Sequence, residues 1–316
     1  MAIMNFYVTA QKIMELQEEG KYKEALDLTL KAHKNFTKQH NRTGYWLACL
    51  YSKLDDKGNA IQSLREWINE GYWTSPKTLS KETDLDNIRN TEEFKKIIEI
   101  NKKRFEEEKK YAKPEVSVII PKSYSKDDLY PLLIAIHWRG SNIEEFSHYY
   151  KDVVIEEETV LGVVQSSQLC GDNMYCWDDY DKAKQEIEEH YDKIMSEYSV
   201  NNDDVILSGA SQGGKLSIEL ALEDIIECRG FISVIPYLPD INDYTDKIAQ
   251  AVKKGIKAVI ITGDKDISYE NTIELSKKMK DAGMDFKLFV KKNMGHTIPS
   301  DFKSLLKTSI DFIMND

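Results

Sequence analysis

Ser211 stands between two glycines in a segment whose residue types suit nucleophilic chemistry. The pentapeptide Gly209-Ala210-Ser211-Gln212-Gly213 has the spacing G-x-S-x-G. An apolar run at residues 205–207 precedes it, and apolar residues at helical spacing follow it at 216–222. A strand that turns directly into a helix holds such a serine in a strained conformation with its hydroxyl exposed. The flanking glycines suit this turn, because a Cβ at either position would clash where strand and helix approach. We predict that Ser211 is a nucleophile; the alternative is a glycine-rich turn whose serine only caps the helix.

A serine hydroxyl is a poor nucleophile unless a base takes its proton and a carboxylate orients that base. Two downstream loops offer these groups. Asp264 and Asp266 follow a predicted strand at residues 258–261, and His296 follows another at 286–290. Because catalytic groups collect at the carboxyl ends of strands in open α/β sheets, we predict His296 as the base and one of the two aspartates as its partner. The alternative for His296 is an ordinary loop histidine at the surface.

These motifs together resemble those of the α/β-hydrolase superfamily, especially its small carboxylesterase and phospholipase-like members, over residues 115–316. In that superfamily the order along the chain is Ser, then Asp or Glu, then His. The family pattern G-x-x-D selects Asp266, three residues after Gly263, with Asp264 as the alternative acid, and a glycine precedes His296 as in the family's G-H pair. The resemblance implies a serine hydrolase that cleaves a carboxylic ester through an acyl-enzyme and needs no cofactor.

A tetrahedral intermediate also needs N–H donors aimed at its oxyanion. The chain reads His137-Trp138-Arg139-Gly140 after the predicted strand at 132–136, which resembles the family's H-G-R-G loop. The resemblance implies the backbone N–H groups of Arg139 and Gln212 as the oxyanion hole. Trp138 stands where the family has glycine, and a bulky residue restricts φ, so the N–H of Trp138 is the alternative donor. The Arg139 side chain could meet an anionic substrate group or form a surface salt bridge.

Aromatic residues near these loops are candidates for substrate contact. We predict Trp138, Tyr175 and Trp177 as substrate-binding residues, the last two from the loop at 168–178 that follows the predicted strand at 160–164. The alternative is that these rings anchor their loops on the core. Nothing in the sequence identifies the acyl or alcohol group, and a thioesterase or peptidase would use the same machinery.

Beyond Pro114 short apolar runs alternate with helical segments. The runs lie at residues 116–120, 132–136, 160–164, 205–207, 231–235, 258–261 and 286–290, and helical patterns fall at 183–197, 216–224, 272–282 and 302–314. Most runs are continuously apolar, as strands buried on both faces are. We therefore predict an α/β catalytic domain at 113–316 with a doubly wound, mostly parallel sheet.

Residues 1–112 read as helices throughout. Residues 20–26 align with 55–61, so that Ala25 recurs 35 residues later as Ala60. A period near 34 is typical of tetratricopeptide repeats, so we predict a tetratricopeptide-like all-α domain, with a generic helical bundle as the alternative. Two repeat units do not bury their faces alone. We therefore expect this domain to contact the catalytic domain, a second copy of the chain in a homodimer, or a protein partner.

Composition limits the remaining function classes. The formal net charge is -11 with no isolated basic cluster, which argues against nucleic-acid binding. No stretch reads as a signal peptide or membrane span, so we expect a cytoplasmic protein without a membrane partner. The four cysteines are scattered and favour free thiols, and no spacing indicates a metal site. The rival to an enzyme is a helical-repeat adaptor protein with a catalytically inactive hydrolase domain.

Overall fold

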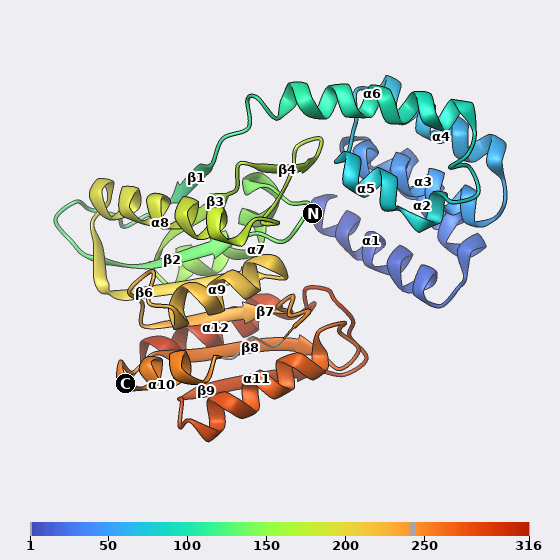
Figure 1. Cartoon of the computed structure of the whole chain (residues 1–316). Coiled ribbons are helices and arrows are strands. Elements are labelled where there is room, and N and C mark those ends of the chain that lie inside the picture. The colour runs from blue at the N-terminus through green and yellow to red at the C-terminus, as the bar shows by residue number, and fades with distance from the viewer. Residues whose placement is uncertain (1, 241–243, 316) are drawn as a thin grey trace. The chain divides into compact units, whose positions relative to one another are not determined.

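The computed structural model describes residues 2–240 and 244–315 (Figure 1). The chain divides into two compact units, which are described separately below. The helical unit consists of Met1–Ala112 together with Leu169–Asp172, and the sheet unit of Lys113–Gln168 and Asn173–Asp316. The predicted division into 1–112 and 113–316 did not include the assignment of Leu169–Asp172 to the helical unit.

The sheet unit is built on seven strands in the order β1-β3-β2-β6-β7-β8-β9. Only β1 runs antiparallel to its neighbour; the other pairs are parallel. The strands are β1(Glu115–Ile119), β2(Tyr130–Ile136), β3(Val160–Gln165), β6(Val200–Ala210), β7(Gly230–Val234), β8(Lys257–Gly263) and β9(Phe286–Lys291). The α/β class and the mostly parallel sheet are confirmed.

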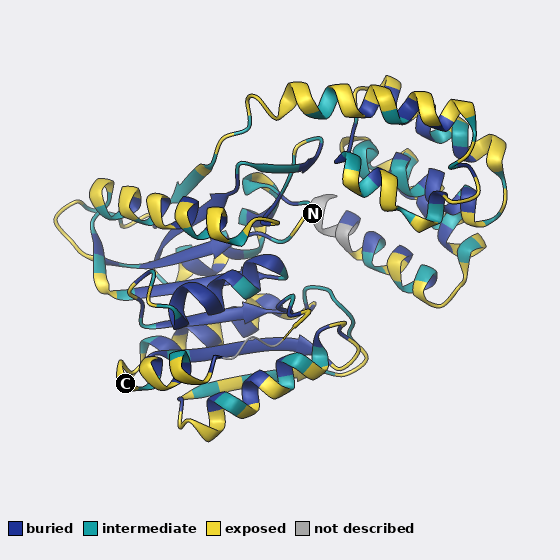
Figure 2. Ribbon diagram, viewed as in Figure 1, coloured by how far each residue is buried: buried dark blue, intermediate teal, exposed yellow. Residues whose placement is uncertain are grey.

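Helices cover both faces of this sheet, so the strands are buried between two layers (Figure 2). One face packs against α8(Tyr180–Glu197), α9(Gln212–Leu222), α10(Thr245–Lys253) and α11(Tyr269–Asp281), and the other against α7(Ile143–Glu156) and α12(Phe302–Met314). Successive side chains of β2 point to opposite faces of the sheet. Leu132 and Ile134 pack into the core under the first group of helices and Leu133 into the core under the second. All residues of α9 except Lys215 are buried. The core therefore fixes the helix that begins directly after Ser211.

A second, two-stranded sheet lies in the segment that the sequence indicated as a rim loop. It comprises β4(Gln168–Gly171) and β5(Met174–Cys176). Asn173 lies in the turn between them at φ 50°, in the left-handed region that asparagine tolerates better than most residues. No pattern in the sequence indicates this hairpin, because its strands are four and three residues long, too short to show alternation.

The helical unit contains α1(Ala2–Glu18), α2(Tyr22–Asn35), η1(Thr37–Gln39), α3(His40–Lys53), α4(Lys57–Asn69), α5(Pro76–Lys81), η2(Thr83–Leu85) and α6(Glu92–Glu108). Side-chain oxygens of Asp56, Ser75 and Thr91 accept backbone N–H groups and cap α4, α5 and α6. Ala25 in α2 and Ala60 in α4 are both fully buried, as small residues between closely packed helices are. The tetratricopeptide assignment itself stays a prediction.

Within the described residues, no helix combines the length and the apolar character that crossing a membrane requires.

Candidate active site

Ser211 lies at the junction of β6 and α9 in a backbone conformation that non-glycine residues rarely adopt. Its φ is 55° and its ψ is -115°. A Cβ on Gly209 would lie 2.2 Å from the carbonyl oxygen of Gly213, and a Cβ on Gly213 would lie 2.0 Å from that of Ile136. Both flanking glycines are therefore required by the close approach of strand and helix. The Ser211 side chain forms no capping hydrogen bond to α9, which removes the capping alternative.

His296 connects Ser211 to Asp266 through its two ring nitrogens. Nε2 is 2.7 Å from the Ser211 Oγ, and Nδ1 is 2.8 Å from the Asp266 Oδ2. Because a carboxylate only accepts, Nδ1–H donates to Asp266, and Nε2 of the neutral ring accepts from the serine hydroxyl. The Asp266 side chain is fully buried and that of His296 is 24% exposed. The arrangement can transfer the serine proton to the imidazole.

The loops after β8 and β9 carry these two residues and are fastened to each other. The other Asp266 oxygen, Oδ1, accepts from the N–H of Ser268 at 2.7 Å. Asp264 is exposed and accepts from the N–H of Asn293 at 2.7 Å, in the loop that leads to His296. A Cβ on Gly263 would lie 1.9 Å from the carbonyl oxygen of Met294, so the two loops touch there. The structure thus brings Asp266 to the histidine, while Asp264 fastens the loop.

The loop after β2 is held by His137, which is buried. Burial lowers the pKa of His137 to about 4, so the ring is neutral at physiological pH. Its Nδ1–H donates to the carbonyl oxygen of Trp138 at 2.7 Å. The indole Nε1–H of Trp177 donates to the carbonyl oxygen of His137 at 2.8 Å. Trp177 is fully buried and anchors this loop. Its role in substrate binding stays a prediction.

Trp138, which replaces the family's first loop glycine, packs into the core beside α7. Its ring meets Phe146 at 5.1 Å and Tyr149 at 5.3 Å, both edge-on. The Arg139 side chain pairs with Asp178 at 3.3 Å, with both side chains more than a third exposed. An ion pair at such an exposed place contributes little stability.

The Gln212 side chain makes two hydrogen bonds near the site in addition to the role that the sequence predicts for its backbone N–H. Its Oε1 accepts from the N–H of Trp177 at 2.9 Å, and its Nε2–H donates to Asp178 Oδ1 at 2.9 Å. Tyr175 is half-buried; its N–H donates to the Ser141 carbonyl at 2.9 Å. A buried amide can find partners anywhere in the fold, so no local pattern in the sequence indicates these contacts.

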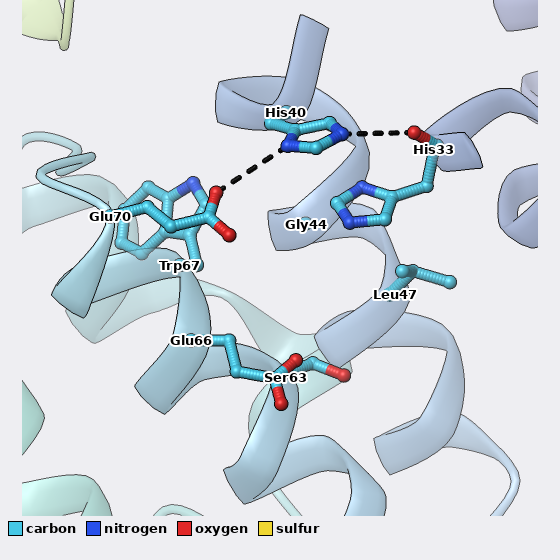
Figure 3. Close-up of a pocket in the computed structure, with 8 residues that line it drawn as sticks. All are labelled: His33, His40, Gly44, Leu47, Ser63, Glu66, Trp67 and Glu70. Carbon is cyan, nitrogen blue, oxygen red and sulfur yellow. Dashed lines mark hydrogen bonds and ion pairs between the residues drawn. The ribbon is translucent and has the colours of Figure 1, made fainter. Parts of the chain in front are cut away.

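The described residues include no group of three or more His, Cys, Asp or Glu side chains that could hold a metal ion. A separate small pocket lies in the helical unit, where the rings of His33 and His40 stack at 4.0 Å (Figure 3). Burial and the neighbouring His40 lower the pKa of His33. The cavity volume is about 20 Å³, room for one water molecule and not for an organic substrate.

Comparisons with known proteins identify a family model and several solved structures that are similar to parts of this chain. The family model "A/B hydrolase-like, N-terminal domain" matches residues 6–109. No curated protein matches the chain. An uncharacterized protein from Bacillus cereus ATCC 10987 is 27% identical, with a TM-score of 0.56 and 97% of each chain covered. The similarity to that structure therefore extends over both units of this chain.

Two esterase structures match the sheet-containing part of the chain. Esterase PE8 is 17% identical, with a TM-score of 0.53, and covers 64% of this chain and 100% of its own. Est1E from Butyrivibrio proteoclasticus is 17% identical, with a TM-score of 0.50, covering 64% and 93%. At these identities the likeness concerns the fold. The α/β fold with its mostly parallel sheet matches the hydrolase fold of these two structures.

Proposed function

We propose that this chain is a serine hydrolase that cleaves a small-molecule carboxylic ester. The observation that carries the proposal is the hydrogen-bonded series from Asp266 through His296 to Ser211, with both donor–acceptor distances below 3 Å. The strained backbone of Ser211 adds support, because it sets the serine at the tip of a turn fixed on both sides by glycines.

In the first step Ser211 Oγ attacks the ester carbonyl carbon while His296 Nε2 takes the hydroxyl proton. The Asp266 carboxylate stabilises the imidazolium that forms. As the tetrahedral intermediate collapses, the bond to the alcohol oxygen breaks and His296 returns the proton to that oxygen. The acyl group remains on Ser211. Water then attacks the acyl-enzyme with the same proton transfers and releases the carboxylic acid.

The oxyanion is held, in this proposal, by the N–H groups of Gln212 and Arg139. Later residues of the loop are engaged: the Gly140 N–H donates to the Tyr175 carbonyl at 2.7 Å and the Ser141 N–H to that of Trp138 at 3.3 Å. The family pattern indicates Arg139 as the donor from this loop, with Trp138 as the alternative. Removing one oxyanion donor typically costs about 10²- to 10³-fold in kcat.

Labelling with a fluorophosphonate probe, followed by intact-mass measurement, tests the activated serine. We expect one adduct on the wild type and none on Ser211→Ala. Ser147→Ala, which changes a half-buried serine on α7, is the matched control and should label like the wild type. No adduct on folded wild-type protein would contradict the proposal. It would favour the catalytically inactive adaptor, for which Trp138 in place of the family's glycine is the supporting observation.

The same machinery serves a thioesterase or a peptidase. Turnover of matched oxygen esters, thioesters and amides by the labelled enzyme would separate these activities. We expect the ester to be cleaved faster than the amide, because an alkoxide leaves more readily than an amide nitrogen does. Faster turnover of the thioester than of the ester would assign a thioesterase.

A further inference from the structure

Asp178 lies between the two residues whose backbone N–H groups are the proposed oxyanion donors. One of its carboxylate oxygens, Oδ1, accepts from the Gln212 Nε2–H at 2.9 Å and from the Arg139 Nη1–H at 3.3 Å. Gln212 begins α9 directly after Ser211, whereas Arg139 lies in the loop after β2, and all of these residues belong to the sheet unit. A single oxygen atom therefore joins the two elements that the proposed mechanism requires on either side of the oxyanion.

Gln212 is the fixed end of this connection. Its helix is held by the core, and the residue itself is only 7% exposed. Both ends of its side-chain amide are engaged, because Oε1 accepts from the Trp177 N–H at 2.9 Å while Nε2–H donates to Asp178. A buried amide with its donor and its acceptor both satisfied has one preferred orientation. Gln212 therefore presents a fixed donor to the Asp178 carboxylate.

The chain that carries Asp178 is itself held close to the site. Two residues after the Tyr175 carbonyl, which accepts from the Gly140 N–H at 2.7 Å, the chain reaches Trp177. That indole is fully buried and donates to the His137 carbonyl at 2.8 Å. Asp178 follows directly, so its carboxylate projects from a segment that is bonded on both sides of the loop that carries Arg139.

Arg139 is the end of the connection that lies in a turn. Trp138 before it packs into the core beside α7, and Gly140 after it has a φ of 82°, in the left-handed region that favours glycine. The ion pair with Asp178 draws the Arg139 side chain toward Gln212 across this turn. The Asp178 side chain is 41% exposed, and an exposed ion pair contributes little stability. Asp178 can therefore be changed without unfolding the sheet unit.

We propose that Asp178 is a positioning residue for ester hydrolysis, which holds the loop of Arg139 against Gln212 so that both proposed N–H donors converge on one oxyanion. The proposal rests on the function proposed above. A displacement of about 1 Å can cost about 10²-fold in rate, so a modest shift of one donor is measurable. Because the oxyanion exists only past the ground state, such a shift lowers kcat and leaves KM nearly unchanged.

The charge of Asp178 acts in the opposite direction to this positioning. A carboxylate near a developing oxyanion repels it, so an effect of charge alone would make removal of the carboxylate raise kcat. An effect of positioning makes the removal lower kcat, and an uncharged acceptor of the same shape restores it. The sign of the change in kcat and its rescue therefore distinguish the two.

The test compares Asp178→Ala with Asp204→Ala in the full chain, with p-nitrophenyl acetate as substrate. Asp204 makes a matching pair of bonds, accepting from the Arg229 Nη1–H at 3.0 Å and from the Asn201 Nδ2–H at 2.7 Å. It precedes Ser211 on the extended strand β6 by roughly 20 Å. We expect Asp178→Ala to lower kcat about 10-fold with KM changed less than about 3-fold, and Asp204→Ala to keep both constants.

Asp178→Asn is the conservative variant, because its amide oxygen can accept from both Gln212 and Arg139. We expect its kcat to stay within about 3-fold of the wild type. Wild-type or raised kcat in Asp178→Ala, equal losses in Asp178→Ala and Asp178→Asn, equal losses in Asp178→Ala and Asp204→Ala, or a change in KM alone would overturn the proposal.

Inhibition by trifluoroacetone measures the oxyanion geometry without turnover. Ser211 Oγ adds to the ketone carbon, His296 takes the hydroxyl proton, and the carbonyl oxygen becomes an oxyanion as in the tetrahedral intermediate. We expect its inhibition constant to rise in Asp178→Ala by about the factor by which kcat falls, because such an analogue depends on the same donors as the transition state. An unchanged inhibition constant beside a lowered kcat would overturn the proposal.

Fluorophosphonate labelling of the wild type separates this inference from the proposed function. A wild type that does not label removes the function and the inference with it. A wild type that labels, together with wild-type kcat in Asp178→Ala, removes the inference alone. Should Asp178→Ala not fold, Asp178→Leu keeps the branched shape without an acceptor and carries the same expectation for kcat and KM.

Discussion

The three residues of the proposed reaction differ in how strongly their surroundings constrain them. Ser211 is fixed by its own strained backbone and by Gly209 and Gly213. His296 is hydrogen-bonded to Asp266 and to Ser211 and keeps 24% of its side chain exposed. The Asp266 carboxylate sets its tautomer, because it accepts the proton on Nδ1 and leaves Nε2 facing the serine. The choice between Asp264 and Asp266 is consequently the sharpest question at the scale of single residues.

Asp266→Asn should reduce kcat about 10³- to 10⁴-fold, because an amide cannot hold His296 with Nδ1 protonated and Nε2 available to Ser211. Asp264→Asn should cost less than about 10-fold, since an amide oxygen can still accept from the Asn293 N–H. Steady-state kinetics of the two variants at equal concentration makes the comparison. A larger loss from Asp264→Asn would show that the wrong aspartate has been assigned.

At the scale of elements, the site depends on how the loop after β2 is held against β6 and α9. The neutral ring of His137 closes this loop on itself by donating to the Trp138 carbonyl, and Trp177 supports it from the hairpin side. The ring stays neutral because burial lowers its pKa to about 4. A group whose pKa is lowered on folding stabilises the fold above its unfolded pKa. That stability is lost as the pH falls toward the folded value.

We therefore expect the free energy of unfolding to fall between about pH 6.5 and pH 4, with His137 contributing on the order of 2 kcal/mol at pH 4.5. Urea unfolding at pH 7.5 and pH 4.5 measures this fall in the free energy of unfolding. In His137→Asn, whose amide can still donate to Trp138, the fall should be smaller by the contribution of His137. His148→Asn, which changes an exposed histidine on α7, should behave like the wild type. An unchanged decrease in His137→Asn would contradict the assignment.

At the scale of elements, features encoded by neighbouring residues can be predicted from the sequence, whereas features that depend on distant contacts cannot. Strands such as β3 and β8 carry apolar runs buried on both faces, and the motifs around Ser211 and His296 are local, so both can be read from neighbouring residues. The β4–β5 hairpin is too short to show a pattern. The burial of Trp177 and the side-chain partners of Gln212 depend on residues more than 30 positions away, and no local pattern encodes them.

At the scale of the whole molecule, the chain combines a unit that carries the proposed chemistry with a helical unit that contains no part of it. The family model over residues 6–109 and the similarity of the Bacillus cereus protein over 97% of this chain indicate that the two units occur together. Whether the helical unit also binds a partner or a second copy stays a prediction.

The most direct measurement is to trap the acyl-enzyme, because a fluorophosphonate adduct reports an activated serine and not ester turnover. The enzyme would be quenched in acid within milliseconds of mixing with p-nitrophenyl acetate, and its peptides mapped by mass. We expect an acetyl group on Ser211, released at the rate of steady-state turnover, and no such group on Ser211→Ala. Ester hydrolysis without an acyl group on Ser211, or with the group on another residue, would contradict the proposed mechanism.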